Sequence, residues 1–145
     1  MVEVTFDYQG NFRCESTHGP STSKLLTDAP TDNEGRGEAF SPTDLVATAL
    51  VTCIITTMAI AGKKHDVLLD GSKGKIQKIM STTPPRRIAE LIAEIEIPLS
   101  PSHPMRARLE AAAHACPVHK SLHPEVKIKI AMRWTGEDSF QRSFP

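Results

Sequence analysis

The segment between Asp44 and Lys63 constrains the fold more than any other part of the chain. It holds 18 consecutive uncharged residues, LVATALVTCIITTMAIAG, a length at the threshold for a membrane-spanning helix. Ser41 and Pro42 precede this run with the residue types of a helix cap and a first helical position, and Asp44 places a carboxylate in the first turn. We therefore expect a helix from Pro42 to about Lys64.

Two features favour a core helix over a membrane span. Four threonines interrupt the apolar run, and the downstream segments are amphipathic strands with no second apolar run. A helix that is apolar on all sides needs cover on all sides, which a chain of 145 residues seldom supplies alone. We expect a homodimer whose core this helix helps to fill, with no membrane insertion.

Charge and cysteine content narrow the classes of partner and compartment. Lys+Arg and Asp+Glu both number 17, and no segment gathers basic residues as nucleic-acid or anionic-membrane binding requires. The start, MVEVTFDYQG, has no basic stretch followed by an apolar run, so the expected location is cytoplasmic. Three cysteines are too few for a disulfide scaffold, so we expect free thiols.

Strand-like alternation flanks the helix on both sides. Val2 to Tyr8 and Phe12 to Thr17 predict a hairpin through Gly10-Asn11, a third strand is expected near Ser23 to Thr27, and residues 28–38 predict a loop with a binding role. After the helix we expect antiparallel strands at Lys73 to Met80 and Ile88 to Leu99, although Arg87 to Leu91 is also compatible with a helical turn. A helix at Met105 to Ala115, a strand at Val126 to Trp134, and a frayed or partner-bound Glu137 to Pro145 complete one α+β domain over residues 1–145.

Cys116 lies at a predicted helix boundary. Pro117 lacks the N–H that would continue the preceding helix, so one helix ends near Cys116 and a short one begins at Pro117 and extends to Leu122. The N-terminus of the short helix, with His119 or Lys120, favours a thiolate at Cys116. The alternative is a small buried residue at a turn.

Cys53, in the middle of the apolar helix, has no helix end beside it. On the residues alone it is more simply an inert core cysteine, and it becomes a nucleophile only if the fold brings a cation against it. Cys14 is expected to be a strand residue without an assigned role.

These segments together resemble a known family. SPTDLVATALVTC, followed 63 positions beyond Cys53 by AAAHACPVHKSLHPEVKI, resembles the OsmC/Ohr family of thiol-dependent hydroperoxide reductases. TDAPTDNEGRGEAFSPTDL resembles an uncharacterised branch of that family, and the resemblance runs from about Val4 to Trp134. It implies antiparallel sheets around a long central apolar helix, in an intertwined homodimer with a site near the dimer interface.

The resemblance also implies a reaction. The Cys53 thiolate attacks the distal oxygen of an organic hydroperoxide, and Cys116 condenses with the resulting sulfenic acid to form a disulfide. An external dithiol reduces that disulfide, and no prosthetic group is expected. The family order of attack replaces the preference for Cys116 that the residues alone suggest.

Relatives also hold the thiolate with an arginine that a glutamate orients. The position expected for that glutamate, ten before Cys53, is Thr43, and Asp44 falls on the opposite side of the helix. Arg36 in the loop and Arg13 on the hairpin are the candidate arginines. Arg36 is preferred because a mobile loop could close over a site.

Two other functions compete with peroxide reduction. His114, Cys116, His119 and His123 are metal-ligating types, but their spacing matches no standard zinc or copper site. The third possibility keeps the dimeric fold without the chemistry, with an apolar cavity that binds a hydrophobic small molecule. Thr43 in place of the glutamate is the main support for that binder.

Overall fold

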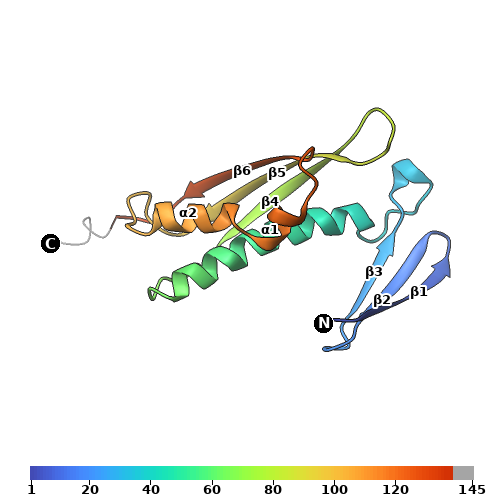
Figure 1. Ribbon diagram of the computed structural model, residues 1–145, viewed down its shortest axis with the longest axis horizontal. Helices are drawn as coiled ribbons and strands as arrows, with labels where there is room; N and C mark the ends of the chain where they lie inside the picture. The colour runs from blue at the N-terminus through green and yellow to red at the C-terminus, as the bar shows by residue number, and fades with distance from the viewer. Residues whose placement is uncertain (139–145) are drawn as a thin grey trace. The chain divides into compact units, whose positions relative to one another are not determined.

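A computed structural model of the protein describes residues 1–138 (Figure 1). The chain divides into two compact units, the first ending at Val46 and the second starting at Ala47. The expectation that residues 1–145 form one domain stays a prediction. The expectation for Glu137 to Pro145 falls mostly outside the described residues.

The first unit is a three-stranded antiparallel sheet in the order β1 (Val4–Gly10), β2 (Arg13–His18) and β3 (Lys24–Asp28). Asn11 and Phe12 connect β1 and β2, with φ angles of 51° and 63°. Two successive residues with positive φ are the geometry that matches the twist of a two-residue hairpin. The predicted hairpin and third strand are confirmed.

The register of this sheet separates an apolar face from a polar one. Because side chains alternate along a strand, Tyr8 and its partner Cys14 lie on one face, and Arg13 and its partner Asp28 lie on the other. The apolar face exposes large side chains that the described chain leaves uncovered: Val4, Phe6, Tyr8 and Leu25. Cys14 is a strand residue, as predicted.

The loop after β3 is folded back on its own beginning. It contains a short 3₁₀ helix at Thr31–Asn33, and the N–H groups of Asn33 and Gly35 both donate to the Pro30 carbonyl. Gly35 has no room for a side chain, because a Cβ atom there would lie 1.6 Å from the Ala29 carbonyl oxygen. The loop is compact and held by its own hydrogen bonds. This weakens the argument for Arg36, which assumed a mobile loop that closes over a site.

Helix α1 (Pro42–Lys63) begins with a reciprocal cap. The Ser41 hydroxyl accepts a hydrogen bond from the Asp44 N–H at 3.1 Å, and the Asp44 carboxylate accepts one from the Ser41 N–H at 2.8 Å. This arrangement is a capping box with aspartate in the place usual for glutamate. The predicted helix start at Ser41-Pro42 is confirmed.

The second unit places helices on one face of a three-stranded sheet. Its strands, in spatial order, are β4 (Lys73–Met80), β5 (Ile88–Ile97) and β6 (Lys127–Trp134), and α2 (Arg106–His114) and α3 (Pro117–Ser121) lie between β5 and β6 in the chain. The predicted strands and helices are present, and residues 88–91 are strand, so the alternative of a helical turn there is wrong.

One topological expectation needs correction, because β6 runs parallel to β5. The antiparallel prediction holds for β4 with β5 but not for this pair. The physical reason is the connection. Two helices carry the chain back across the sheet, so β6 starts at the same end as β5, as a crossover requires.

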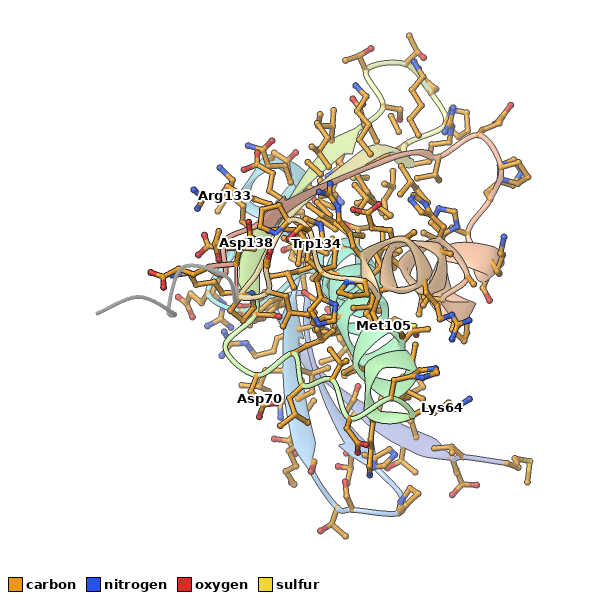
Figure 2. All side chains as sticks on the ribbon, turned by 90° about the vertical axis from the view of Figure 1, so that its left-hand side faces the viewer. Lys64, Asp70, Met105, Arg133, Trp134 and Asp138 are labelled. Carbon is orange, nitrogen blue, oxygen red and sulfur yellow. The ribbon has the colours of Figure 1, made fainter. Side chains whose placement is uncertain are left out.

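The apolar core lies between α1, α2 and this sheet (Figures 1 and 2). Leu50, Ile54 and Met58 from α1 are fully buried, and they pack with residues of β5 and α2 that are buried to the same extent, including Leu91 and Leu109. Figure 2 shows Trp134 at the end of β6, where its indole N–H donates to Glu110 at 3.0 Å. The core positions thus follow the apolar periodicity of each element.

Within residues 1–138, one side of α1 is buried and another side is exposed. Among residues 1–138, α1 is the one helix long and apolar enough to cross a membrane, by length and composition alone. Its buried residues repeat at helical spacing, whereas Ile60 on another side is 62% exposed. A stripe of this kind is typical of a core helix in a soluble fold.

Candidate active site

Two cysteines from distant parts of the sequence meet in the second unit. Cys53 is half-buried in the middle of α1, and Cys116 is fully buried directly before α3. The two thiol groups are within hydrogen-bonding reach of each other. The structure therefore brings together the two residues that the resemblance pairs.

The sulfur of Cys116 caps α3. It accepts a hydrogen bond from the His119 N–H at 3.3 Å, with Pro117 at the first helical position. Pro117 has no N–H to satisfy there and is already in a helical φ range, so the Cys-Pro pair both ends one helix and starts the next. The predicted boundary at Cys116 is confirmed.

The start of α3 also donates a hydrogen bond to Cys53. A hydrogen bond from the Val118 N–H is the main cause that lowers the pKa of Cys53, and the Cys116 thiol and the Thr57 hydroxyl lower it further. The N–H groups at the start of one helix thus serve both sulfurs: the Val118 N–H bonds to Cys53 and also to Cys116, and the His119 N–H bonds to Cys116.

The pKa of Cys116 shifts in the opposite direction. Burial raises its pKa and outweighs the hydrogen bond from the His119 N–H. The expectation from the residues alone, that the helix end makes Cys116 the activated thiol, is wrong, because desolvation of a thiolate costs more than this short helix returns. Cys53 is the thiol that is more easily ionised.

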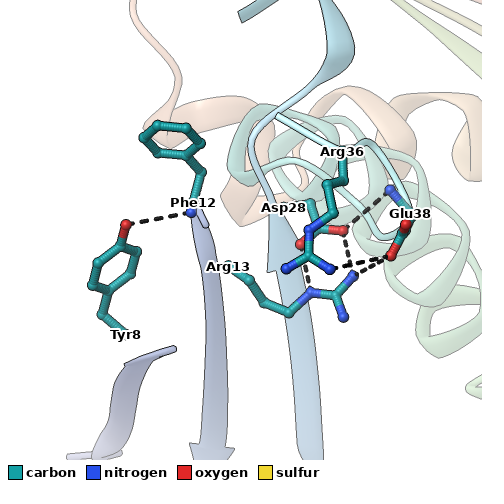
Figure 3. Close-up of polar contacts among 6 residues, drawn as sticks. All are labelled: Tyr8, Phe12, Arg13, Asp28, Arg36 and Glu38. Atoms are coloured by element: carbon teal, nitrogen blue, oxygen red, sulfur yellow. Dashed lines mark hydrogen bonds and ion pairs between the residues drawn. The ribbon is translucent and has the colours of Figure 1, made fainter. Parts of the chain in front are cut away.

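Arg13 is the centre of a polar cluster in the first unit (Figure 3). Its guanidinium forms a two-pronged ion pair with Asp28, with both N–O distances 2.7 Å, and Nη2 contacts Glu38 at 3.1 Å. Asp28 is 1% exposed and also accepts from the Glu38 N–H at 3.1 Å. Hydrogen bonding from Arg13 lowers the pKa of Asp28 and raises that of Arg13, so both stay charged.

Arg36 is held much less firmly. Its guanidinium lies 3.9 Å from Glu38, and both side chains are about half exposed. An exposed pair at this distance fixes a side chain weakly. Of the two candidate arginines, Arg13 is the one whose orientation the fold sets.

Thr43 and the histidines have ordinary structural surroundings. The Thr43 hydroxyl lies 3.2 Å from the Ser41 hydroxyl at the start of α1. His114 and His119 stack edge to face with ring centres 6.2 Å apart, and burial lowers the pKa of His119. Across residues 1–138, no three His, Cys, Asp or Glu side chains gather as a metal ion requires, so the metal hypothesis loses its support.

Four contacts within the two separate clusters were not apparent from the sequence: those of Thr57 and Val118 in the second unit, and those of Asp28 and Glu38 in the first. Thr57 follows Cys53 by four residues, a spacing that places two side chains together on a helix. The sequence was therefore sufficient to predict this contact. Val118 acts through its backbone, which no residue type reveals. Asp28 and Glu38 depend on strand register and on a loop path.

Comparison with known proteins identifies the family of the chain. The family model described as OsmC-like protein matches residues 35–131. The chain belongs to the OsmC family. No curated protein matches the sequence significantly.

Solved OsmC-family structures share the fold. A protein of Psychrobacter arcticus 273-4, named provisionally as an osmotic stress induced and detoxification response protein, is 34% identical, with a TM-score of 0.86 over 92% of this chain and 96% of the other. The organic hydroperoxide resistance protein OsmC of Legionella pneumophila is 17% identical, with a TM-score of 0.72 over 92% and 96%. OhrB of Bacillus subtilis, an organic hydroperoxide resistance protein, is 18% identical, with a TM-score of 0.66 over 92% and 98%.

Proposed function

We propose that this OsmC-family protein is a thiol-dependent peroxidase that reduces organic hydroperoxides to alcohols. The observation that carries the proposal is the pairing of two thiols of opposite character. Cys53 is partly accessible and has a lowered pKa, whereas its neighbour Cys116 is buried and has a raised pKa. An accessible thiolate beside a protonated partner is what attack followed by resolution requires.

The reaction uses three steps. The Cys53 thiolate attacks the distal oxygen of the hydroperoxide, the O–O bond breaks, and the leaving alkoxide takes a proton to become an alcohol. The Cys116 sulfur then attacks the Cys53 sulfenic acid, which releases water and forms a disulfide. An external dithiol reduces this disulfide by exchange, so the cycle needs no prosthetic group.

Arg13 is the arginine we assign to this reaction. Support comes from its double ion pair with Asp28, which holds the guanidinium as the family's glutamate would, from β3 and not from α1. Thr43 at the usual glutamate position is therefore not evidence for a lost clamp. On this proposal, Thr43 no longer favours the alternative of a non-catalytic binder.

We also propose that the active form is a cytoplasmic homodimer. The support is the uncovered apolar surface of both units: Phe6 and Tyr8 on β1 are 72% and 61% exposed, and Ile60 on α1 is 62% exposed. Apolar patches of this kind on a soluble fold mark a partner surface.

The first test is consumption of cumene hydroperoxide by the reduced protein with a dithiol. Cys53→Ser should reduce turnover to the rate of the dithiol alone, because no other thiol of the site has a lowered pKa. Cys116→Ser should consume about one equivalent and then overoxidise at Cys53, which mass spectrometry detects. Cys14→Ser is the matched control and should keep wild-type turnover. A wild-type rate equal to that of the free dithiol would contradict the proposal and favour the small-molecule binder.

A second test separates the two arginines. Arg13→Ala should lower kcat/KM about tenfold or more, because a charge-assisted hydrogen bond to the thiolate or peroxide is lost. Arg36→Ala, the matched control in the same cluster, should change it less than twofold, roughly the range of a weak exposed pair. The reverse order of effects would assign the role to Arg36.

A further inference from the structure

The threonines in the middle of α1 satisfy their hydroxyl groups in two different ways. Thr52 donates to the Thr48 carbonyl at 2.7 Å, and Thr56 donates to the Thr52 carbonyl at 2.9 Å. Bonding back to a carbonyl one turn earlier is the usual arrangement for threonine inside a helix. Thr57 differs, because the contact of its hydroxyl is with the Cys53 sulfur at 3.9 Å.

This difference is a rotamer choice with an alternative available. Threonine has two accessible χ1 positions in a helix because its hydroxyl can reach an earlier carbonyl. Thr57 and Cys53 are four residues apart and face the same side of α1, so either the Cys53 carbonyl or its sulfur is within range. The half-buried Thr57 hydroxyl lies against the sulfur, as a donor to a thiolate would.

Within the second unit, the groups that stabilise a negative charge on this sulfur are neutral donors. They are the Val118 N–H at the start of α3, the Cys116 thiol and the Thr57 hydroxyl. The first is a backbone group, and the second is consumed in the reaction. Thr57 is therefore the one side chain of this set that stays a donor through the whole cycle.

We propose that Thr57 is a catalytic residue that donates its hydroxyl to the Cys53 thiolate and keeps the charge on sulfur until the O–O bond is attacked. This role rests on the proposed peroxidase function. As the thiolate attacks, one S–O bond forms, the O–O bond breaks, and the negative charge passes to the leaving alkoxide. The hydroxyl keeps its own proton throughout.

Loss of one neutral hydrogen bond has an expected size. Thr57→Val keeps the shape of the side chain without the donor, and the midpoint of Cys53 ionisation should rise by about 0.5–1 pH unit. At pH values below both midpoints, the thiolate fraction falls about three- to tenfold. Since a more basic thiolate is also more nucleophilic, attack should slow only about two- to fourfold. At pH values above both midpoints, Thr57→Val should react as fast as wild type or about twofold faster.

The experiment measures alkylation of Cys53 by iodoacetamide against pH in the full-length reduced protein, with the Cys53 peptide followed by mass spectrometry. Hydroperoxide consumption is measured on the same samples. Thr57→Ser should restore the wild-type midpoint. Thr52→Val, which removes a hydroxyl that bonds to a carbonyl on the same helix, should leave it unchanged. Should Thr57→Val fail to fold, Thr57→Ala removes the same donor.

Two results would overturn the proposal in distinguishable ways. An active wild-type enzyme whose alkylation midpoint is the same in Thr57→Val would remove Thr57 from the mechanism and leave the peroxidase intact. A wild-type protein that consumes no hydroperoxide would remove both. A midpoint that rises in Thr57→Val and in Thr52→Val alike would indicate a general loosening of α1, and would also count against a role for Thr57.

Discussion

The two units of this protein bury opposite kinds of side chain. In the second unit the buried positions are apolar and link α1, α2 and the β4–β6 sheet, with Leu50, Ile54 and Leu109 fully enclosed. In the first unit the buried residues are the polar Asp28 and Ser41, and large apolar side chains such as Phe6 are exposed. The second unit has a core of its own, whereas a three-stranded sheet with an exposed apolar face depends on cover from elsewhere.

The two groups of residues proposed for the reaction, the cysteines and Arg13, lie in different units. The cysteines lie in the unit with an apolar core, where the Val118 N–H lowers the pKa of Cys53 and burial raises the pKa of Cys116. Arg13 lies in the other unit, where an ion pair with the buried Asp28 holds its guanidinium. The reacting thiols and the assigned cation are thus stabilised by different forces, and they should respond differently to mutation, pH and salt.

The largest effect should come from the apolar core. Ile54→Ala removes a fully buried side chain and should lower the free energy of unfolding by about 2–4 kcal/mol. Thr56→Ala, on the exposed side of the same helix, should change it by about 0.5 kcal/mol or less. Urea denaturation followed by circular dichroism measures both. Equal effects would mean that the core of the second unit is not where the structure places it.

The exposed face of β1 should give the next effect. Phe6→Glu puts a charge on the apolar face, and self-association should weaken by about tenfold or more, because a charge is costly to bury. Thr5 precedes Phe6 on β1 and points to the opposite face of the sheet. Thr5→Glu is therefore the matched control and should leave the dimer intact. Analytical ultracentrifugation over a range of concentrations separates these cases. A wild-type monomer, or dimers unaffected by Phe6→Glu, would contradict the assigned interface.

The ion pair of the first unit should appear as a pH dependence. Arg13 lowers the folded-state pKa of Asp28, so the stabilisation is fully present above the unfolded value of about 3.9 and is lost as the pH falls through the lower folded value. The wild-type melting temperature should therefore fall more steeply below about pH 4 than that of Asp28→Asn. Glu38→Gln, which changes a 59% exposed partner, should keep the wild-type profile. Parallel profiles for wild type and Asp28→Asn would disprove the linkage.

The smallest effect should come from the charged outer face of the second sheet. Lys75 and Glu94 lie 3.2 Å apart, but both side chains are more than half exposed. Lys75→Ala should change the free energy of unfolding by about 0.5 kcal/mol or less, and less still in high salt. Thermal melts at low and high salt measure the change. A loss as large as that from Ile54→Ala would mean that this face is buried in the assembly.

Local signals in the sequence predicted most elements of the fold. Ser41-Pro42 with Asp44 marked the start of α1, and Cys116-Pro117 marked the joint between α2 and α3, because caps and prolines act within a few residues. The direction of β6 could not be predicted in this way. It depends on how a two-helix connection packs, and alternation alone is the same in parallel and antiparallel strands.

The residues alone singled out the two cysteines of the candidate site, whereas the order of attack came only from the resemblance. The resemblance paired Cys53 with Cys116, and the fold places them together. Which thiol is activated depends on burial and on the Val118 N–H, neither of which has a sequence signal. The partner of Arg13 depends on the register of β2 with β3, so a glutamate pattern on α1 does not reveal Asp28.

The distance between the two cysteines along the chain has a consequence for folding. Cys53 and Cys116 are 63 positions apart, and the chain between them contains β4, β5 and α2. A disulfide between them would close most of the second unit into one covalent ring. Closing a ring of that length lowers the entropy of the unfolded chain by an amount equivalent to about 4 kcal/mol. Each oxidation would therefore make the protein harder to unfold, and its resistance to proteolysis would report its redox state.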